Sequence, residues 1–419
     1  MNSEKQSTNL QMTLREVNRV GEGQKNVPKL RFKGYEDAWE QRKLEDIADV
    51  SIGEFVIKSK QNDDAPYPVF NGGKECTGYY DEYNNEANKI VISARGANAG
   101  FVNIVEKRFW AGNSCYSISI KDEKMYHLYF LYQFIKFRES LFTEFQQAAN
   151  IPSVSKKDVL FFSVEHPLFE EQNEIGNFYR DLDSLITLHQ RKYDALKSMK
   201  KTLLSKMFPK NGEDVPEIRF KEFTDAWEQR KLGSFADVTK LAGFEFTEHV
   251  VYSDSGKIIA LRGLNVKEGK LVLNDVKYID GSNFGKLNRS KLFKNDILFT
   301  YVGTVGDVAI IKENDRFYLA PNVARIRIQS NDSPIFISHF MRNDNFYRQI
   351  ILPLIATSSQ PALSMENIRK FELYLPSSRE EQDKSAELFE NLDKEITLHQ
   401  RKLEELKNMK KTLLQQMFV

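Results

Sequence analysis

With 419 residues the chain is long enough for two to four domains, and 41% hydrophobic and 28% charged residues are typical of a water-soluble protein. No run approaches the roughly 20 apolar residues of a membrane-spanning helix, and the N-terminus lacks the apolar core of an export signal, so we expect a cytoplasmic protein without membrane contact. The net charge of +1 is low for a protein dedicated to nucleic acid. Basic charge would have to be local, or partner subunits would have to supply it.

The sequence predicts no catalytic residues, no metal site and no cofactor in this chain. Its two cysteines, Cys76 and Cys115, form no CxxC pair, and six scattered histidines lack metal-ligand spacing. We interpret both cysteines as reduced core residues of an intracellular protein. The chain has no GxxxxGK(S/T) or GxGxxG phosphate loop, no GxSxG or HExxH motif, and no Asn-Pro-Pro-aromatic run of the kind expected in an amino-methylating enzyme.

Residues 1–26 are polar and aperiodic, which predicts a mostly disordered tail, with a short helix at Gln11–Val20 as the alternative. A first α/β domain is expected over residues 27–167. Short runs rich in Val, Ile, Tyr and Phe, punctuated by glycines, predict strands at residues 67–70, 89–93, 101–105 and 116–120 and a closing strand at 159–164, and apolar residues at helical intervals predict a helix over 125–146.

Residues 168–214 contain a first long helix and a linker, because proline is absent and glycine nearly absent between Leu168 and Phe208. A helix of that length measures about 60 Å at about 1.5 Å per residue. A second domain is expected over residues 215–376, and a second long helix over 377–419. Within the second domain the same reasoning predicts strands at residues 257–261, 296–301, 308–311, 324–328 and 368–375, with a helix near 335–351.

The ends of the two halves are repeated, whereas their middles have diverged. Residues 27–50 and 215–238 are identical at 16 of 24 positions, and residues 186–208 and 396–418 at 17 of 23. We interpret this as one scaffold used twice to carry two different recognition domains. The expected fold class is α+β, with two pseudo-symmetric α/β domains separated by a pair of long antiparallel coiled-coil helices. Repeated scaffold surfaces also imply two copies of one partner.

A seven-residue repeat along both long helices predicts a left-handed coiled coil. Its seam residues are Leu182, His189, Leu196 and Leu203 in the first helix, and Leu392, His399, Leu406 and Leu413 in the second. Because the helices are close sequence relatives, each is the simplest partner of the other, and the pseudo-twofold symmetry favours antiparallel pairing. The two histidines are either tolerated polar seam residues or a register-setting pair. A metal site is disfavoured because neither histidine has a carboxylate or cysteine at ligand spacing.

Three local motifs occur once in each half. They are W-E-x-x-K-L at Trp39–Leu44 and Trp227–Leu232, P-x-x-S-x-x-x-(V/I) at Pro152–Val159 and Pro361–Ile368, and E-E-Q at Glu170–Gln172 and Glu380–Gln382. Together with the duplicated architecture, they make the chain after residue 26 resemble the specificity subunits of type I restriction-modification systems.

That resemblance implies a function. Each variable segment would be a target-recognition domain reading one half of a bipartite sequence in double-stranded DNA, and the paired helices would act as a ruler that fixes the gap. Two copies of the modification subunit would bring S-adenosylmethionine and the adenine-methylation centre, and two copies of the restriction subunit would bring the ATP-driven, magnesium-dependent translocase and nuclease. This chain itself would be non-catalytic.

Candidates for DNA contact are Arg, Lys, Asn and Gln residues on loops, which read base edges, and Tyr and Ser or Thr residues, which suit stacking or backbone contact. In the first domain they are Asn71, Lys74, Tyr79, Tyr80, Arg95, Asn98, Lys107 and Arg108. In the second they are Arg262, Asn265, Tyr301, Thr304, Asn322, Ser358 and Gln360. For each of them a solvated or structural role is the alternative. The glycine turns Gly96–Gly100 and Gly303–Gly306 are interpreted as tight turns, with approach to the DNA backbone as the alternative.

A competing hypothesis is a coiled-coil adaptor that joins two protein partners without binding DNA. It predicts acidic or apolar loop tips instead of glycine-flanked Arg, Asn and Lys tips. A salt-dependent DNA affinity of the assembled complex would distinguish the two hypotheses.

Overall fold

The computed structural model describes residues 17–19, 27–144, 152–210, 212–355 and 361–418. The chain divides into two compact units. The first comprises Met1–Arg191 and Gln400–Val419, and the second comprises Lys192–His399. Each unit therefore contains part of both long helices.

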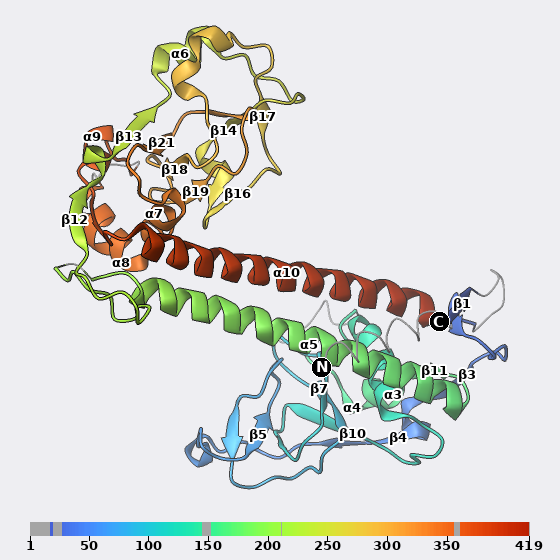
Figure 1. Cartoon of the computed structure of the whole chain (residues 1–419). Coiled ribbons are helices and arrows are strands. Elements are labelled where there is room, and N and C mark those ends of the chain that lie inside the picture. The colour runs from blue at the N-terminus through green and yellow to red at the C-terminus, as the bar shows by residue number, and fades with distance from the viewer. Residues whose placement is uncertain (1–16, 20–26, 145–151, 211, 356–360, 419) are drawn as a thin grey trace. The chain divides into compact units, whose positions relative to one another are not determined.

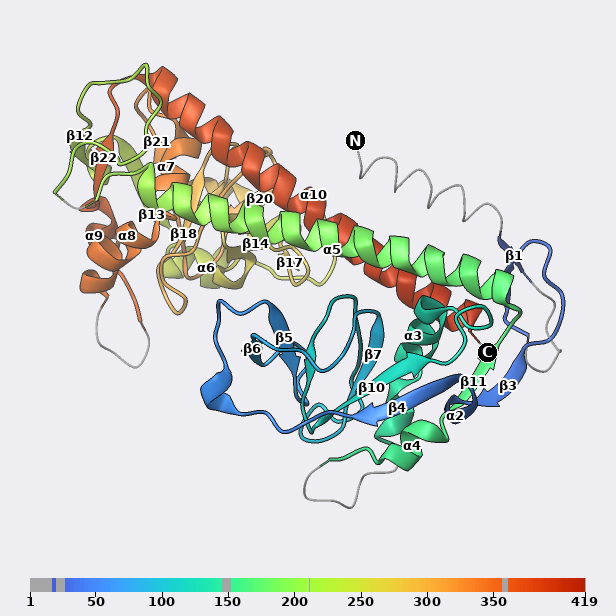
Figure 2. The same ribbon diagram turned by 90° about the horizontal axis from the view of Figure 1, so that it is seen from below.

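The first unit contains a four-stranded antiparallel sheet (Figure 1, Figure 2). In sheet order its strands are β4 (Ala48–Ile52), β10 (Cys115–Ile120), β7 (Lys89–Ser93) and β8 (Val102–Val105). A three-stranded sheet has the order β6 (Gly78–Tyr80), β5 (Tyr67–Phe70) and β9 (Trp110–Ala111), with β5 parallel to β9. Two further antiparallel pairs are β1 (Val17–Arg19) with β2 (Leu30–Phe32), and β3 (Glu40–Lys43) with β11 (Ser163–His166). The short helices are α2 (Leu44–Ile47), α3 (Leu128–Phe137) and α4 (Lys156–Leu160).

The second unit repeats this topology. Its four-stranded sheet has the order β13 (Ala236–Lys240), β21 (Val323–Ile328), β18 (Ile297–Thr300) and β19 (Val308–Ile310). Its three-stranded sheet has the order β17 (Lys277–Tyr278), β14 (Ile259–Leu261) and β20 (Phe317–Leu319), with β14 parallel to β20. The remaining pairs are β12 (Glu228–Lys231) with β22 (Glu372–Leu375), and β15 (Val266–Lys267) with β16 (Lys270–Leu271). The short helices are α6 (Gly243–His249), α7 (Pro334–Phe340), α8 (Asp344–Phe346) and α9 (Met365–Arg369). The predicted mixed fold, used twice, is confirmed.

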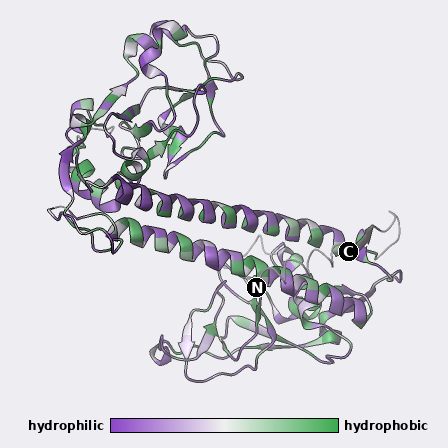
Figure 3. Ribbon diagram, viewed as in Figure 1, coloured by the Kyte–Doolittle hydropathy of each residue, from purple (hydrophilic) through white to green (hydrophobic). Residues whose placement is uncertain are grey.

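The two long helices are α5 (Phe169–Lys206) and α10 (Arg379–Met417). In the first unit Lys410 Nζ contacts Asp183 Oδ1 at 2.6 Å, and Lys407 Nζ contacts Gln190 Oε1 at 3.3 Å. Residue numbers rise along one helix as they fall along the other, so the helices pair antiparallel there. In Figure 3 both helices are mostly hydrophilic with hydrophobic residues at intervals, as a solvent-exposed helix pair requires.

None of the eight predicted seam residues is exposed. Leu182, Leu392, Leu406 and Leu413 are buried, and Leu196 and Leu203 are half-buried against the core of the second unit. His189 and His399 are both half-buried, and the Glu395 carboxylate lies 4.0 Å from His399 Nε2, which corrects the expectation that neither histidine has a carboxylate at ligand spacing. Among the described residues no three His, Cys, Asp or Glu side chains are grouped so as to hold a metal ion.

Each long helix ends in a phenylalanine that completes the core of one unit. Phe418 follows α10 and stacks on Tyr179 of α5 at 5.8 Å between ring centroids, and Trp39 lies 6.2 Å away. Phe208 follows α5 and stacks on Phe389 of α10 at 5.7 Å. Both phenylalanines are at least 95% buried, so each core needs residues from both halves of the sequence.

The closing strands were predicted several residues too early. Residues 156–160 form α4, because the Ser155 hydroxyl accepts the Asp158 N–H at 3.1 Å and the Asp158 carboxylate accepts the Ser155 N–H at 2.9 Å. This capping box starts a helix where β-branched and aromatic residues had suggested a strand. The strand of the predicted 159–164 segment is β11, Ser163–His166, and that of the predicted 368–375 segment is β22, Glu372–Leu375.

The two internal helices are shorter than predicted. In the first unit α3 ends at Phe137, and a 3-10 turn follows at Glu139–Phe142. In the second unit the predicted helix divides into α7, α8 and a π-helical turn at Tyr347–Ile351. No helix in the described part of the chain is long and apolar enough to cross a membrane. Of the N-terminal tail, the described residues 17–19 form β1, and the rest lies outside the described residues.

Candidate nucleic-acid interface

The P-x-x-S motif anchors the glycine turn of each unit. The Gly96 N–H donates to the carbonyl oxygen of Pro152, and the Gly303 N–H donates to that of Pro361, both at 2.9 Å. The serine of each motif then caps the next helix, since the Ser364 hydroxyl accepts the Asn367 N–H just as Ser155 caps α4. The motif therefore fixes the position of the turn and leaves the side chains of the turn free to vary.

The E-E-Q motif ties the start of each long helix to the repeated N-terminal segment. Arg31 forms a two-pronged ion pair with Glu171 at 2.7 and 2.8 Å, and Arg219 forms the same pair with Glu381 at the same distances. The Gln172 amide donates to the Pro167 carbonyl oxygen at 2.8 Å. Arg31, Glu171, Gln172 and Glu381 are buried and Arg219 is half-buried, so the repeated motifs build the scaffold.

Three loops of the first unit converge around the glycine turn that follows β7. Asn71 in the loop after β5 accepts the Ser114 N–H at 2.9 Å, and the Ser93 hydroxyl donates to the Gly73 carbonyl oxygen at 3.1 Å. A Cβ at Gly72 would lie 3.0 Å from the Arg95 carbonyl oxygen, so the two loops touch. Candidates Asn71, Lys74, Arg95 and Asn98 are thereby brought together, with Lys74 and Arg95 exposed and Asn71 and Asn98 half-buried.

The other candidates of the first unit lie elsewhere. Because β9 runs parallel to β5 with Val69 opposite Trp110, Lys107 and Arg108 lie toward the start of β5, at the opposite end from Asn71. Arg108 pairs with Glu86 at 2.9 Å and lies over the Tyr83 ring. Tyr79 is half-buried and receives a weak hydrogen bond from Cys76.

Tyr80 is a core residue. Its side chain is buried, and its hydroxyl donates to the Ile57 carbonyl oxygen at 2.8 Å and accepts the Ile57 N–H at 2.6 Å. Its ring packs edge-on against Trp110. This placement corrects the interpretation of Tyr80 as a stacking residue for DNA.

The second unit brings the equivalent loops together. The Tyr301 N–H donates to the Asn322 carbonyl oxygen at 3.1 Å, and a Cβ at Gly263 would lie 3.8 Å from the Asn322 Cβ. Thr304 and Asn322 are exposed, and Tyr301 is half-buried beneath the Lys240 ammonium. The loops after β14, β18 and β20 thus correspond to those after β5, β7 and β9.

Two candidates in the loop after β14 have internal partners. Asn265 is fully buried, its amide donates to the Val272 and Asp275 carbonyl oxygens, and its oxygen accepts the Arg262 N–H. Asn265 is therefore a structural residue, which corrects its interpretation as a base reader. Arg262 is half-buried and pairs with the exposed Asp275 at 2.8 Å. Ser358 and Gln360 lie outside the described residues.

The second glycine of each turn meets a steric requirement. Gly100 and Gly306 both have a positive φ, at 86° and 101°. A Cβ at Gly100 would lie 3.0 Å from the Phe142 Cβ, and one at Gly306 would lie 2.8 Å from the Tyr347 ring. Only glycine fits both the left-handed backbone and the crowding, which supports the interpretation of these segments as tight turns.

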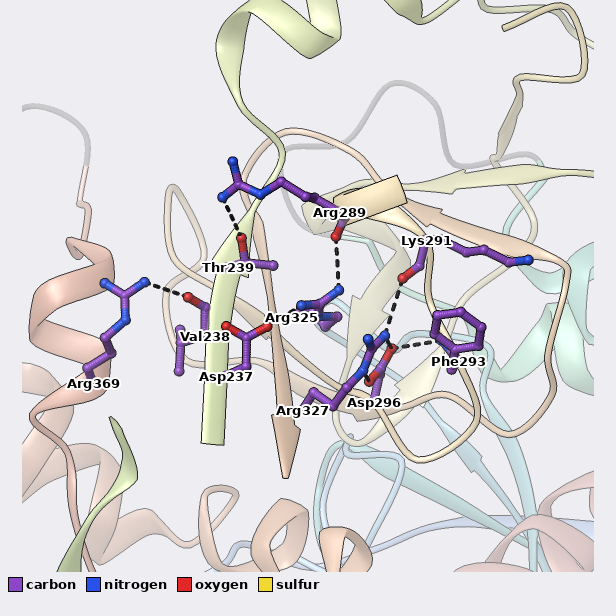
Figure 4. Close-up of polar contacts among 10 residues, drawn as sticks. All are labelled: Asp237, Val238, Thr239, Arg289, Lys291, Phe293, Asp296, Arg325, Arg327 and Arg369. Carbon is purple, nitrogen blue, oxygen red and sulfur yellow. Dashed lines mark hydrogen bonds and ion pairs between the residues drawn. The ribbon is translucent and has the colours of Figure 1, made fainter. Parts of the chain in front are cut away.

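Sequence reasoning missed a charged network on the sheet of the second unit (Figure 4). Arg325 pairs with Asp237 and donates to the Arg289 carbonyl oxygen at 2.9 Å, while Arg327 forms a two-pronged pair with Asp296 at 2.7 Å. Burial lowers the pKa of the Arg325 guanidinium, and the hydrogen bonds to Asp296 raise the pKa of Arg327. The alternating Arg-Ile-Arg of β21 could have indicated two charged side chains on one face of the strand. Their acidic partners could not be identified, because Asp237 and Asp296 lie far away in sequence.

Comparison with known proteins identifies the family. A model of the type I restriction modification DNA specificity domain matches residues 36–198 and 224–408, which is more than half of the chain. The chain belongs to this family. Membership gives it a DNA sequence-recognition role within a restriction-modification system and disfavours the adaptor hypothesis. Specificity subunits of this family are in general non-catalytic and associate with methyltransferase and restriction subunits and with DNA.

Individual relatives agree with this family assignment. The specificity subunit of the type I restriction enzyme MjaVIII from Methanocaldococcus jannaschii is 24% identical over 402 residues, which cover 88% of this chain and 91% of that subunit. The EcoBI specificity subunit from Escherichia coli is 24% identical over 123 residues, covering 29% of this chain and 26% of that subunit. The crystal structure of a type I S subunit from M. genitalium matches with a TM-score of 0.63 at 18% identity, covers 94% of this chain and 99% of that one, and shows the same fold.

Proposed function

We propose that this specificity subunit reads an asymmetric bipartite DNA target, with one half-site for each unit. The observation that carries the proposal is that equivalent loops converge in both units on identical anchors, at Gly96 and Pro152 in one and Gly303 and Pro361 in the other. The exposed side chains on those loops differ. One scaffold with two different sets of reading residues fits a target whose two halves have different sequences.

The gap between the half-sites is set by α5 and α10 in this proposal. A helix of about 60 Å spans at most about 18 base pairs at about 3.4 Å per pair. Adding one base pair to the gap also rotates the second half-site by about 34–36° around the duplex axis. A rigid helix pair therefore tolerates one gap length and rejects its neighbours.

The catalytic parts lie on partner subunits in this proposal. Two modification subunits bind the repeated scaffold and carry S-adenosylmethionine and the adenine-methylation centre. Two restriction subunits carry ATP, magnesium and the nuclease. These partners also supply much of the positive charge that binding DNA requires, which accounts for the +1 net charge of this chain.

The experiment that tests the ruler inserts one heptad into α5 and one into α10, in register. The methylated sequence is then compared with that of the original protein. The proposal predicts the same two half-sites separated by a longer gap. Changed half-site sequences with an unchanged gap would contradict it. A salt-dependent affinity of the assembled complex for the target DNA checks that DNA is the ligand.

A further inference from the structure

The longest identical run shared by the two halves is mostly exposed. Asp37–Leu44 and Asp225–Leu232 both read DAWEQRKL, eight consecutive identical residues. The tryptophan and the leucine are buried in both units, so the cores account for them. The other positions are exposed, apart from the half-buried Arg230. Core packing does not explain why these positions are identical.

Exposed positions beside this run have changed freely. Lys29 faces solvent where the second half has the exposed Glu217, and Glu36 corresponds to the exposed Thr224. Exposed positions in this segment can thus differ between the two halves. The identity of the exposed E-Q-R-K residues needs a cause of its own.

Contacts within the chain do not supply that cause, because the two copies make different ones. Arg42 pairs with Glu40 of its own strand at 3.1 Å, whereas Arg230 pairs with Asp332 at 2.9 Å. Gln41 donates to the Ser163 hydroxyl, and its counterpart Gln229 donates to the Glu372 carboxylate. The four residues Glu-Gln-Arg-Lys are therefore identical in the two halves, although the residues that they contact differ.

Both copies form an edge strand. Within the described residues β3 pairs only with β11, and β12 pairs only with β22. All four side chains of β3 are exposed, as are three of the four of β12. An edge strand leaves N–H and C=O groups on its open side, which an extended segment of another protein can use. Glutamate at one end and lysine at the other set the direction in which a charged partner segment fits.

We propose that Glu40–Lys43 and Glu228–Lys231 are two equivalent docking strands for one partner protein, with one copy bound at each strand. That partner is the modification subunit, so this inference rests on the proposed function. Its docking segment has acidic side chains opposite the Arg-Lys end and basic side chains opposite the Glu end. Because the two strands are identical, one partner surface serves both units.

The test exchanges the end charges of each strand and keeps the net charge. The variants are Glu40→Lys with Lys43→Glu in the first unit, Glu228→Lys with Lys231→Glu in the second, and all four together. Control variants are Lys29→Glu and Thr224→Glu, each of which installs a residue type that the other half already has at that position. Native mass spectrometry of the full chain with the modification subunit counts the bound copies, and thermal melting checks that each variant is folded.

The original chain and both controls are expected to bind two copies. Each double variant is expected to bind one copy, with at least tenfold weaker binding at the altered strand, and the quadruple variant none. Two copies bound with unchanged affinity in the folded quadruple variant would overturn the inference. Intact partner binding with weakened DNA binding would overturn it too, by assigning the strands to DNA, and altered self-association of the chain alone would assign them to a second copy. If the original chain bound no modification subunit, the proposed function would fail instead.

Discussion

The four-stranded sheets of the two units have the same strand order and different polar chemistry on one face. In the first unit the Ser51 and Ser117 hydroxyls face each other across β4 and β10 at 2.8 Å. Lys89 at the start of β7 donates to the Ser119 hydroxyl at 2.5 Å. The polar groups there are small and mostly neutral.

In the second unit ion pairs occupy the equivalent face. Arg325 and Arg327 stand where β10 has Ser117 and Ser119, and Asp296 before β18 stands where the first unit has Lys89. The buried isoleucine between them, Ile118 or Ile326, is the same in both. The comparison teaches that the isoleucine face holds the topology, while the opposite face, where Ser117, Asp296 and Arg325 are also buried, can change the sign of its charge at one position.

The largest effect is expected from removing the feature that both units share, which is the buried phenylalanine after each long helix. Phe418→Ala should destabilise the first unit by about 3–5 kcal/mol, because it removes a buried ring from the core. Phe208→Ala should cost the second unit a similar amount. Hydrogen exchange read separately over the two units checks the assignment, with exposed Leu398→Ala as the control. Loss confined to the opposite unit in either variant would contradict the core assignment.

The next effect sharpens the difference between the sheets. Asp296→Ala should lower the free energy of unfolding by at most about 3–5 kcal/mol, because it leaves the Arg327 guanidinium without its carboxylate. The loss should fall below that range because the Arg327 side chain is 35% exposed and water can solvate its charge. Ser119→Ala at the position equivalent to Arg327 removes a single hydrogen bond and should cost about 0.5–1.5 kcal/mol. Denaturant unfolding of both variants measures the two costs. Equal costs would show that the ion pairs add nothing over the neutral face.

The reading loops should separate the units by function. Lys74→Ala or Arg95→Ala should weaken recognition of the first half-site only, by about 1–3 kcal/mol for a base contact, and relax one base position. Asn322→Ala should act only on the second half-site. Sequencing of methylated sites in cells checks both expectations. Methylation patterns that stay unchanged in the Lys74 and Arg95 variants would remove these residues from the interface.

The last effect depends on pH and concerns Lys200, which pairs with Asp393 in the second unit. Burial and the nearby Arg342 lower the pKa of Lys200 to about 8, below its ordinary 10.5. Between these two values the unfolded chain binds more protons than the folded one, so the free energy of unfolding should rise with pH. The rise should reach at most about 1.4 kcal/mol per pH unit. Unfolding of the original chain and of Lys200→Met from pH 8 to 10.5 tests this, and the same slope in both would contradict it.

The sequence predicted the elements whose signals are local. The strands at residues 67–70 and 89–93 were found from short runs of strand-forming residues near glycines, and both long helices from the absence of proline and the seven-residue repeat. Residues 159–160 were misassigned to a strand because the capping box of Ser155 and Asp158 outweighs the strand preference of Val159 and the residues after it. The S-x-x-D signal was present in the sequence, and the apolar run after it was given more weight.

The site was only partly predictable for a different reason. Residue type marks a side chain as able to contact DNA, but its partners decide whether it is free to do so. The amide of Asn265 is used by the backbone carbonyl oxygens of Val272 and Asp275, which have no signature in sequence. The candidates Lys74 and Arg95 lie together because Gly72 lets two loops touch, a contact that depends on the assembled sheets.

The central claim is that the two units read two different half-sites at one fixed spacing. The most direct measurement maps methyladenine at base resolution in DNA from cells that express this chain with its modification subunit, compared with cells that lack the chain. The account predicts one new split motif with two different halves and a single gap length. A continuous motif, a variable gap, or no new methylation from an assembled complex would contradict it.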